Sequence, residues 1–237
     1  MTRITTISWA IGALLLSGSA EAVTLGQVDD FQLDVSGWGG SVFISASNQT
    51  LAAVRVPGGP LGASDSFLQL ESIGWHLASR NQTQWGGDFL AAGVTAVEFD
   101  ANVFATSDPI ALRIGIYGPG GFFSSSNATS ITSGGWSHYV ISLTESDLTY
   151  APGSGPGGTL PPGTGVFADT LSAVTKFVVR HDSGPTPTAN GFHPQHVTTT
   201  IGLDNIHAVP EPSAFLLAWL AIVSAIATGR QRNMRRR

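Results

Sequence analysis

The chain has 237 residues, a formal net charge of −5 and no cysteine. Between residues 23 and 208 there are five basic residues against fourteen acidic ones, a net charge of −9, which argues against a nucleic-acid partner because such binding needs a basic face. The absence of cysteine excludes disulfides, thiolate metal sites and thiol nucleophiles. Stability must come from a hydrophobic core, and a stretch of about 185 residues suffices for one domain.

The first 22 residues have the layout of a secretory signal peptide. Arg3 lies in a short polar start, an apolar run extends from about Ile7 to Leu16, and small residues end the segment at Ala22. A buried helix or an uncleaved signal anchor is the alternative, but the run is too short to span a bilayer core of about 30 Å. We therefore expect residues 1–22 to be removed and the remainder to be exported.

Residues 23–208 predict β-structure throughout, as a single domain. Short apolar or alternating runs are separated by Gly, Pro, Asn, Asp and Ser, without helical periodicity. The expected strands are 41–46, 51–56, 66–72, 94–104, 110–118, 136–143, 174–180 and 199–209. This pattern favours an all-β antiparallel β-sandwich or jelly roll. Residues 151–165 are rich in Gly and Pro and predict a surface loop.

Strand phase predicts which side chains face outward. In residues 94–104 the odd-numbered positions from 97 to 103 are apolar and predict the core face. The same reasoning on 110–118 and 136–143 completes a set of outward candidates for ligand binding: Glu98, Asp100, Asn102, Arg113, Tyr117, Trp136 and His138. If 94–104 pairs with 110–118 through the turn between them, the first five share one surface. Neighbouring strands of a jelly roll often belong to opposite sheets, which leaves open whether Trp136 and His138 join them.

These side chains have the chemistry of a sugar-binding surface. An exposed indole stacks on the apolar face of a sugar ring, while carboxylates, amides and guanidinium groups bond its hydroxyls. The alternative is a surface ion pair between Glu98 and Arg113, worth about 0–1 kcal/mol, with Trp136 covered by a loop. Carboxylates such as Glu71 and Glu145 would be needed for a glycosidase, but their separation cannot be read from the sequence. We therefore expect no catalytic residues.

Three segments, residues 28–38, 134–143 and 201–209, resemble the opening, middle and closing strands of galactose-binding-like jelly rolls, the fold of many carbohydrate-binding modules. The resemblance implies that the first and last strands lie side by side. It also implies a possible structural calcium, for which Asp29, Asp30 and Asp204 occupy the matching positions. Solvated or hydrogen-bonded edge carboxylates are the alternative. No other cofactor is expected.

The C-terminus contains a short motif, an apolar segment and an arginine-rich tail. The motif, residues 209–213, is Val209, Pro210, Glu211, Pro212 and Ser213. Residues 214–229 predict a transmembrane helix, and the basic residues of 230–237 would stay cytoplasmic. This order resembles the PEP-CTERM sorting signal of bacterial envelope proteins, which implies processing by an exosortase-type membrane enzyme. An uncleaved single-pass anchor is the alternative.

Taken together, the sequence predicts an exported, non-catalytic protein of the cell envelope or extracellular matrix. It would pass through the inner membrane with its N-terminus outside. Its sandwich would be structural or bind a glycan such as exopolysaccharide. A secreted glycan-active enzyme and an uncleaved, membrane-anchored adhesion domain are the alternatives.

Overall fold

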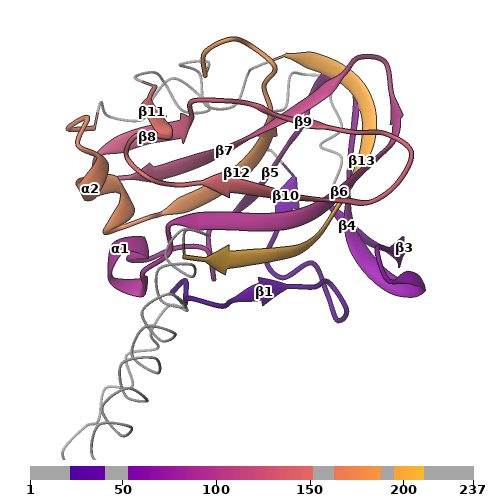
Figure 1. The fold of residues 1–237 in the computed structure, drawn as a ribbon, viewed down its shortest axis with the longest axis horizontal. Coiled ribbons are helices and arrows are strands. Elements are labelled where there is room, and N and C mark those ends of the chain that lie inside the picture. The colour runs from indigo at the N-terminus through magenta and orange to yellow at the C-terminus, as the bar shows by residue number, and fades with distance from the viewer. Residues whose placement is uncertain (1–21, 41–52, 152–162, 188–194, 211–237) are drawn as a thin grey trace, which may run out of the picture.

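Two antiparallel sheets packed face to face form the protein (Figure 1). The computed structural model describes residues 22–40, 53–151, 163–187 and 195–210. The first sheet contains β1 (Val28–Asp29), β3 (Val54–Gly59), β4 (Gly62–His76), β6 (Ala96–Thr106), β10 (Ser137–Ser142) and β13 (His196–Val209). The second contains β2 (Gly39–Gly40), β5 (Ala78–Asn81), β7 (Ile110–Gly118), β8 (Gly121–Ser125), β9 (Thr129–Ile131), β11 (Leu148–Tyr150) and β12 (Lys176–His181). Two short helices, α1 (Phe89–Ala92) and α2 (Phe167–Leu171), lie at one end. The predicted all-β sandwich is confirmed.

The strand order separates two strands that are consecutive in the chain. The first sheet runs β10-β6-β13-β4-β3, with β1 also on β13, and the second runs β11-β8-β7-β12-β5-β2, with β9 also on β7. The turn after β6 therefore crosses from one sheet to the other. Residues 94–104 and 110–118 therefore do not pair, and the five outward side chains that such a pairing would have joined lie on opposite outer faces.

The core lies between the sheets and uses the faces that strand phase predicts. Alternate residues of β6 and β7 belong to one buried apolar cluster: Val97, Phe99, Ala101, Val103, Ile110, Leu112, Ile114 and Ile116. The intervening residues of each strand point away from this core because successive side chains alternate across a strand. Tyr139, Ile141 and Leu143 likewise pack inward, which leaves Trp136 and His138 on the outer face as predicted.

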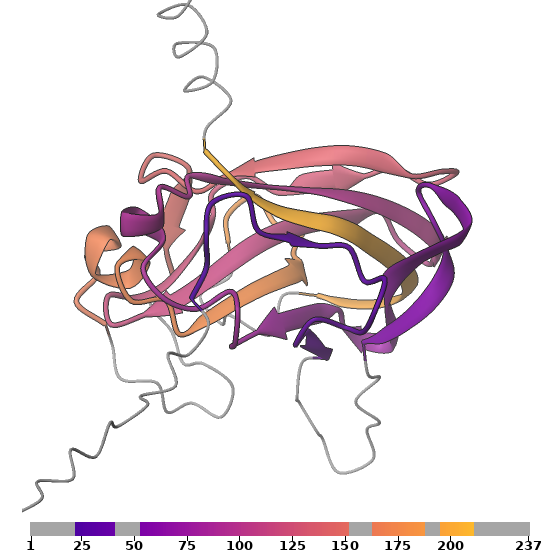
Figure 2. The same ribbon diagram turned by 90° about the horizontal axis from the view of Figure 1, so that it is seen from below.

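The first and last strands lie side by side, as the resemblance implies (Figure 2). Val28 pairs with His207 and Asp29 with Ile206, and the Gly26 amide donates to the Ala208 carbonyl at 2.8 Å. No helix in the described part of the chain is long and apolar enough to cross a membrane. Residues 1–21, 41–52, 152–162 and 211–237 lie outside the described residues, so the signal peptide, the strand at 41–46, most of the 151–165 loop and the apolar segment stay predictions.

Candidate functional site

Five of the seven predicted ligand-binding residues share the outer face of the first sheet. Glu98, Asp100 and Asn102 come from β6, and Trp136 and His138 from the start of β10 and the residue before it. The register sets His138 opposite Asp100, and Asn102 opposite Gly202 of β13. Because β6 lies between β10 and β13, the three strands present one continuous surface. We call it the β6 face.

An aromatic ledge forms one end of the β6 face. The Trp136 indole packs on Phe67 with ring centroids 5.0 Å apart, and Phe67 stacks on Phe104 at 5.2 Å. Trp136 also donates from Nε1 to the Gly58 carbonyl at 3.2 Å. Gly202 leaves room for these rings, since a Cβ there would lie 2.6 Å from Trp136 and 2.8 Å from Phe67. Phe104 is 47% exposed, so the ledge presents apolar surface to solvent. Phe104 was not among the predicted binding residues, although it occupies an outward position of its strand.

A charged row follows the ledge. His138 places Nδ1 3.2 Å from Asp100 Oδ1 and Nε2 3.5 Å from Glu98 Oε2. On the other side of β6, His207 Nδ1 lies 2.7 Å from Glu98 Oε1, and Asn205 Nδ2 donates to Asp100 Oδ2 at 2.8 Å. A neutral imidazole carries a single N–H, so His138 donates to both carboxylates only when it is protonated. These contacts from both neighbouring strands fix the two carboxylates in place. His207 and Asn205 were not predicted, because Asn205 lies in a bulge and His207 directly follows it, and alternation does not reveal a bulge.

Asn102 is the buried member of the β6 face. Its side chain is 8% exposed, and its Oδ1 has no hydrogen-bond donor among the described residues. It lies in the same cross-strand row as Gly202, over which Trp136 packs. The row next to the ledge therefore contains an unused hydrogen-bond acceptor.

Arg113 and Tyr117 lie on the opposite side of the molecule, on the outer face of the second sheet. Arg113 is 1% exposed and donates to the carbonyls of Asp182, Ser126 and Gly184 at 3.2, 2.6 and 2.6 Å. Burial lowers the pKa of Arg113, and the Asp182 carboxylate, 3.6 Å from its Nε, opposes that shift. The Arg113 side chain therefore holds the segments that follow β8 and β12 against the outer face of the sheet.

Tyr117 is buried in an apolar cluster on this outer face, formed with Ala78, Phe122, Ala151 and Val178. Its ring stacks on Phe122 at 4.4 Å, and Lys176 Nζ lies 4.9 Å from its centroid. Burial raises the pKa of the Tyr117 phenol, and Arg180 opposes that shift. Arg180 packs over Phe122 and forms an ion pair with Asp182 at 3.0 Å. Both predicted residues on this face are thus packed within the fold, and the exposed candidates all belong to the β6 face.

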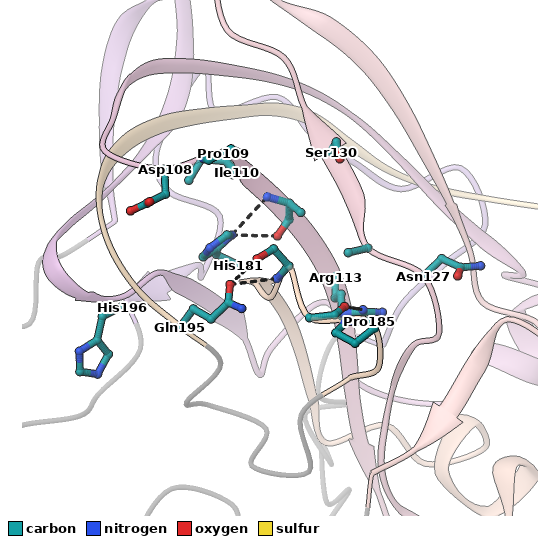
Figure 3. Close-up of a pocket in the computed structure, with 14 residues that line it drawn as sticks. Asp108, Pro109, Ile110, Arg113, Asn127, Ser130, His181, Pro185, Gln195 and His196 are labelled. Carbon is teal, nitrogen blue, oxygen red and sulfur yellow. Dashed lines mark hydrogen bonds between the residues drawn. The ribbon is translucent and has the colours of Figure 1, made fainter.

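A hollow of about 780 Å³ lies at one end of the sandwich, between the start of β7, the residues after β12 and the start of β13 (Figure 3). His181 faces it from a buried position, with Nδ1 3.2 Å from the Ala111 nitrogen and 3.0 Å from the Ala111 carbonyl oxygen. Burial lowers the pKa of His181. No Trp, Tyr or Phe is found among the described residues that line the hollow, so it lacks a stacking platform for a sugar.

The three predicted calcium ligands occupy different environments. Asp29 is buried and accepts from the indoles of Trp38 and Trp85 through Oδ2, at 2.6 Å each. Burial raises the pKa of Asp29, and these hydrogen bonds oppose the shift. Asp30 is exposed and accepts from the Gln32 amide at 3.1 Å. Asp29 thus satisfies the buried N–H groups of Trp38 and Trp85 and fixes the position of both indoles in the core.

Asp204 is fully buried, and its Oδ2 has no hydrogen-bond partner in the described part of the chain. A Cβ on Gly59 would lie 2.5 Å from Asp65 Oδ2 and 3.0 Å from Asp204 Oδ2, so these two carboxylates meet over one glycine. Burial, followed by the nearby carboxylates of Asp65 and Asp100, raises the pKa of Asp204 to about 7. Within residues 22–40, 53–151, 163–187 and 195–210, no group of three His, Cys, Asp or Glu side chains is arranged to hold a metal ion.

No protein-family model matches the chain, and no curated protein sequence matches it. Among solved structures, an exo-β-agarase aligns with 80% of this chain at 15% identity and a TM-score of 0.50; this chain spans 25% of that protein's length. A carbohydrate-binding module specific for non-crystalline cellulose, CBM28, aligns over 79% of this chain and 97% of its own, at 14% identity and a TM-score of 0.44. A family 11 carbohydrate-binding module from Clostridium thermocellum, in complex with a β-1,3-1,4-mixed-linked tetrasaccharide, aligns over 79% and 96%, at 14% identity and a TM-score of 0.45. At 15% identity, the likeness to the agarase shows a shared fold alone.

Proposed function

We propose that residues 23–208 form a non-catalytic glycan-binding module and that the β6 face is its binding surface. The observation that carries the proposal is the aromatic ledge of Trp136 and Phe104 beside the fixed row of Glu98, Asp100 and His138. A sugar needs both parts, because its ring has apolar C–H faces and a rim of hydroxyl groups. The ledge meets the first requirement and the charged row the second.

The β6 face is suited to binding because its polar groups are already positioned. Glu98 and Asp100 are held by contacts from β10 and β13, while their side chains remain 29% and 21% exposed. A ligand would therefore lose little free energy in ordering these side chains. Phe104 adds exposed apolar area at no further ordering cost, since Phe67 stacks beneath it.

The same geometry favours binding over hydrolysis. A glycosidase places two carboxyl groups on opposite sides of the bond that it cleaves. Glu98 and Asp100 occupy alternate positions of one strand and both contact His138. They would lie on the same side of a bound sugar, which supports a binding module rather than a glycan-active enzyme.

We also propose that the protein is exported and sorted by its C-terminal segment. The signal-peptide layout of residues 1–22 and the order of motif, apolar segment and arginines in 209–237 support this route. An exosortase-type enzyme would process the chain near Pro210 and Pro212. The module would then act at the cell surface or in the extracellular matrix, with exopolysaccharide as a candidate ligand.

Of the three predicted calcium ligands, Asp204 fits a bound cation. Its buried oxygen has no hydrogen-bond partner among the described residues, and the Asp65 carboxylate lies beside it, although Asp65 also accepts from Gln32 Nε2 at 2.6 Å and from the Leu61 amide at 2.8 Å. Oxygen atoms of this kind are the ligands that calcium prefers. We propose that Asp204 and Asp65 would hold such an ion, whose charge would offset their mutual repulsion and join β13 to the β3–β4 hairpin. Asp29, already bonded by two indoles, has its buried oxygen occupied.

Affinity measurements with exopolysaccharide from the native host test the glycan proposal. Phe104→Ala and Trp136→Ala should each weaken binding by about tenfold or more, the usual effect of removing an aromatic anchor. Leu90→Ala is the matched control, because Leu90 is a 46% exposed apolar residue on α1, away from the β6 face. If neither ledge variant weakens binding while both remain folded, the β6 face is not the binding surface.

A further inference from the structure

The basic side chains lie mostly on one of the two outer faces of the sandwich. Four of the five basic residues of 23–208 lie on strands of the second sheet and point away from the core: Arg80, Arg113, Lys176 and Arg180. The fifth, Arg55, is on β3 and donates to the carbonyls of Phe31 and Gln32 at 2.7 Å. Strands β10, β6, β13 and β4 contain no lysine or arginine. The β6 face therefore has no permanent positive charge in its strands.

Carboxylates occupy this face instead. Glu98 and Asp100 are partly exposed, and Asp204 lies in the same cross-strand row as Asp100, one strand further along. His138 and His207 are the titratable groups that contact Glu98, and each is uncharged unless protonated. A ligand on the aromatic ledge would thus bind beside at least two negative charges. Like charges at close range are unfavourable, so uronate or sulfate groups would be rejected there.

The carboxylates of the β6 face and Asn102 also offer hydrogen-bond acceptors to a ligand. Ionised carboxylates only accept hydrogen bonds, and the Asn102 Oδ1 in the ledge row is a further acceptor, nine-tenths buried and without a donor among the described residues. A ligand group that contacts these acceptors must therefore supply an N–H or O–H donor. A protonated amine supplies three donors and a positive charge in one group.

We propose that the β6 face selects glycans that carry free amino groups, such as polymers of glucosamine, over neutral and acidic glycans. One sugar ring of the polymer packs on the ledge of Trp136 and Phe104, and ammonium groups of the sugars that follow it along β6 lie against Asp100 and Glu98. This inference rests on the proposed glycan-binding function and names its ligand class. The two carboxylates act as specificity-determining residues, since hydrogen bonds that involve an ionised group are stronger than neutral ones.

The test compares three oligosaccharides of equal length on the full chain: a glucosamine oligomer, its fully N-acetylated counterpart and a uronate oligomer. All are measured by calorimetry in one buffer in which the amine is protonated. We expect the glucosamine oligomer to bind about tenfold or more tightly than the acetylated one, and the uronate oligomer not to bind. Added salt should weaken the glucosamine complex more than the acetylated one, because the charged contact is screened.

The double variant Glu98→Gln, Asp100→Asn should abolish the preference for the amine. Glu145→Gln is the matched control, since Glu145 is an exposed carboxylate outside the β6 face, and it should keep the preference. Equal or tighter binding of the acetylated or uronate oligomer, still sensitive to Phe104→Ala, would overturn the amine preference and leave the glycan-binding function standing. If no glycan binds a chain shown by circular dichroism to be folded, both proposals fail.

Discussion

The indole of Trp136 lies across Gly202 so closely that a single added methyl group would collide with it: a Cβ at residue 202 would lie 2.6 Å from the ring. The rings of the aromatic ledge thus pack directly on the backbone of Gly202. A side chain there would have to displace both Trp136 and Phe67 from their present packing.

Gly202→Ala should therefore lower stability and glycan affinity together. Overpacking of this kind typically costs about 1–3 kcal/mol, and tilting the indole removes part of the stacking surface. Urea denaturation and binding to the native exopolysaccharide measure the two effects. Gly39→Ala is the control, because an added Cβ there meets nothing within 4 Å. A Gly202→Ala protein as stable as wild type would mean that Trp136 does not rest on this glycine.

Arg113→Ala should destabilise the fold and not merely weaken a ligand. The substitution leaves the carbonyls of Asp182, Ser126 and Gly184 without their donor and leaves the Asp182 carboxylate with one guanidinium neighbour fewer. Loss of one member of a buried ion pair costs about 3–5 kcal/mol. Thermal unfolding would show it as a large drop in melting temperature. An unchanged melting temperature together with reduced glycan binding would show that Arg113 contacts the ligand and does not stabilise the fold.

Stability should depend on pH through Asp204. Its pKa is raised from 3.8 to about 7 in the folded chain, so the folded state holds a proton that the unfolded state releases. The stabilising contribution is complete below pH 3.8 and is lost as the pH rises through about 7. Melting temperatures measured in EDTA should fall across this window, and Asp204→Asn should flatten the fall. A fall of the same size in Asp204→Asn would assign the effect to another group.

Calcium should reverse this loss above pH 7, where Asp204 is ionised. A cation beside Asp204 and Asp65 favours the folded state that binds it, so calcium should raise the melting temperature relative to EDTA. Asp204→Asn and Asp65→Asn should abolish the response. Asp34→Asn, which removes an exposed carboxylate elsewhere, should retain it. No response in the wild-type protein would leave the two aspartates as a hydrogen-bonding or proton-sharing pair.

The mature protein should lack its C-terminal segment if the sorting proposal holds. Intact-mass analysis of material from the native host should show a chain that begins near residue 23 and ends close to the motif at 209–213. Processing would separate the domain from the apolar segment 214–229. Recovery of a chain that still ends at Arg237 would favour the uncleaved anchor instead.

The longer strands and the core faces followed from the sequence because alternation and turn residues are local signals, whereas the short strands β5, β8, β9 and β11 were not predicted. Residues 110–118 form β7 as expected, and Phe99 and Ile114 are buried as strand phase predicts. Which strands pair with one another could not be predicted from the sequence. The turn at residues 106–109 joins the two sheets, and nothing in its four residues distinguishes such a crossing from a hairpin.

The candidate site was predictable in part for the same reason. Trp136, His138 and Asp100 were identified by their outward phase, which one strand alone reveals. Arg113 was also correctly placed outward, but an outward position in a sandwich can still be buried when loops pack on it, as the carbonyls of Ser126 and Gly184 show. The contact of His207 with Glu98 depends on β13 lying next to β6. Which strands are neighbours is a property of the whole fold and not of a single strand.

The position of β13 also constrains when the domain can fold. This strand is the last in the described sequence, yet it lies inside the first sheet with β6 on one edge and β4 and β1 on the other. The first sheet therefore remains split into the β3–β4 hairpin, the β6–β10 pair and the lone strand β1 until residues 196–209 are present. During export, folding would have to wait for nearly the entire domain to emerge, as expected for contacts of long sequence separation. Truncations that remove β13 should consequently yield an unfolded chain rather than a smaller sandwich.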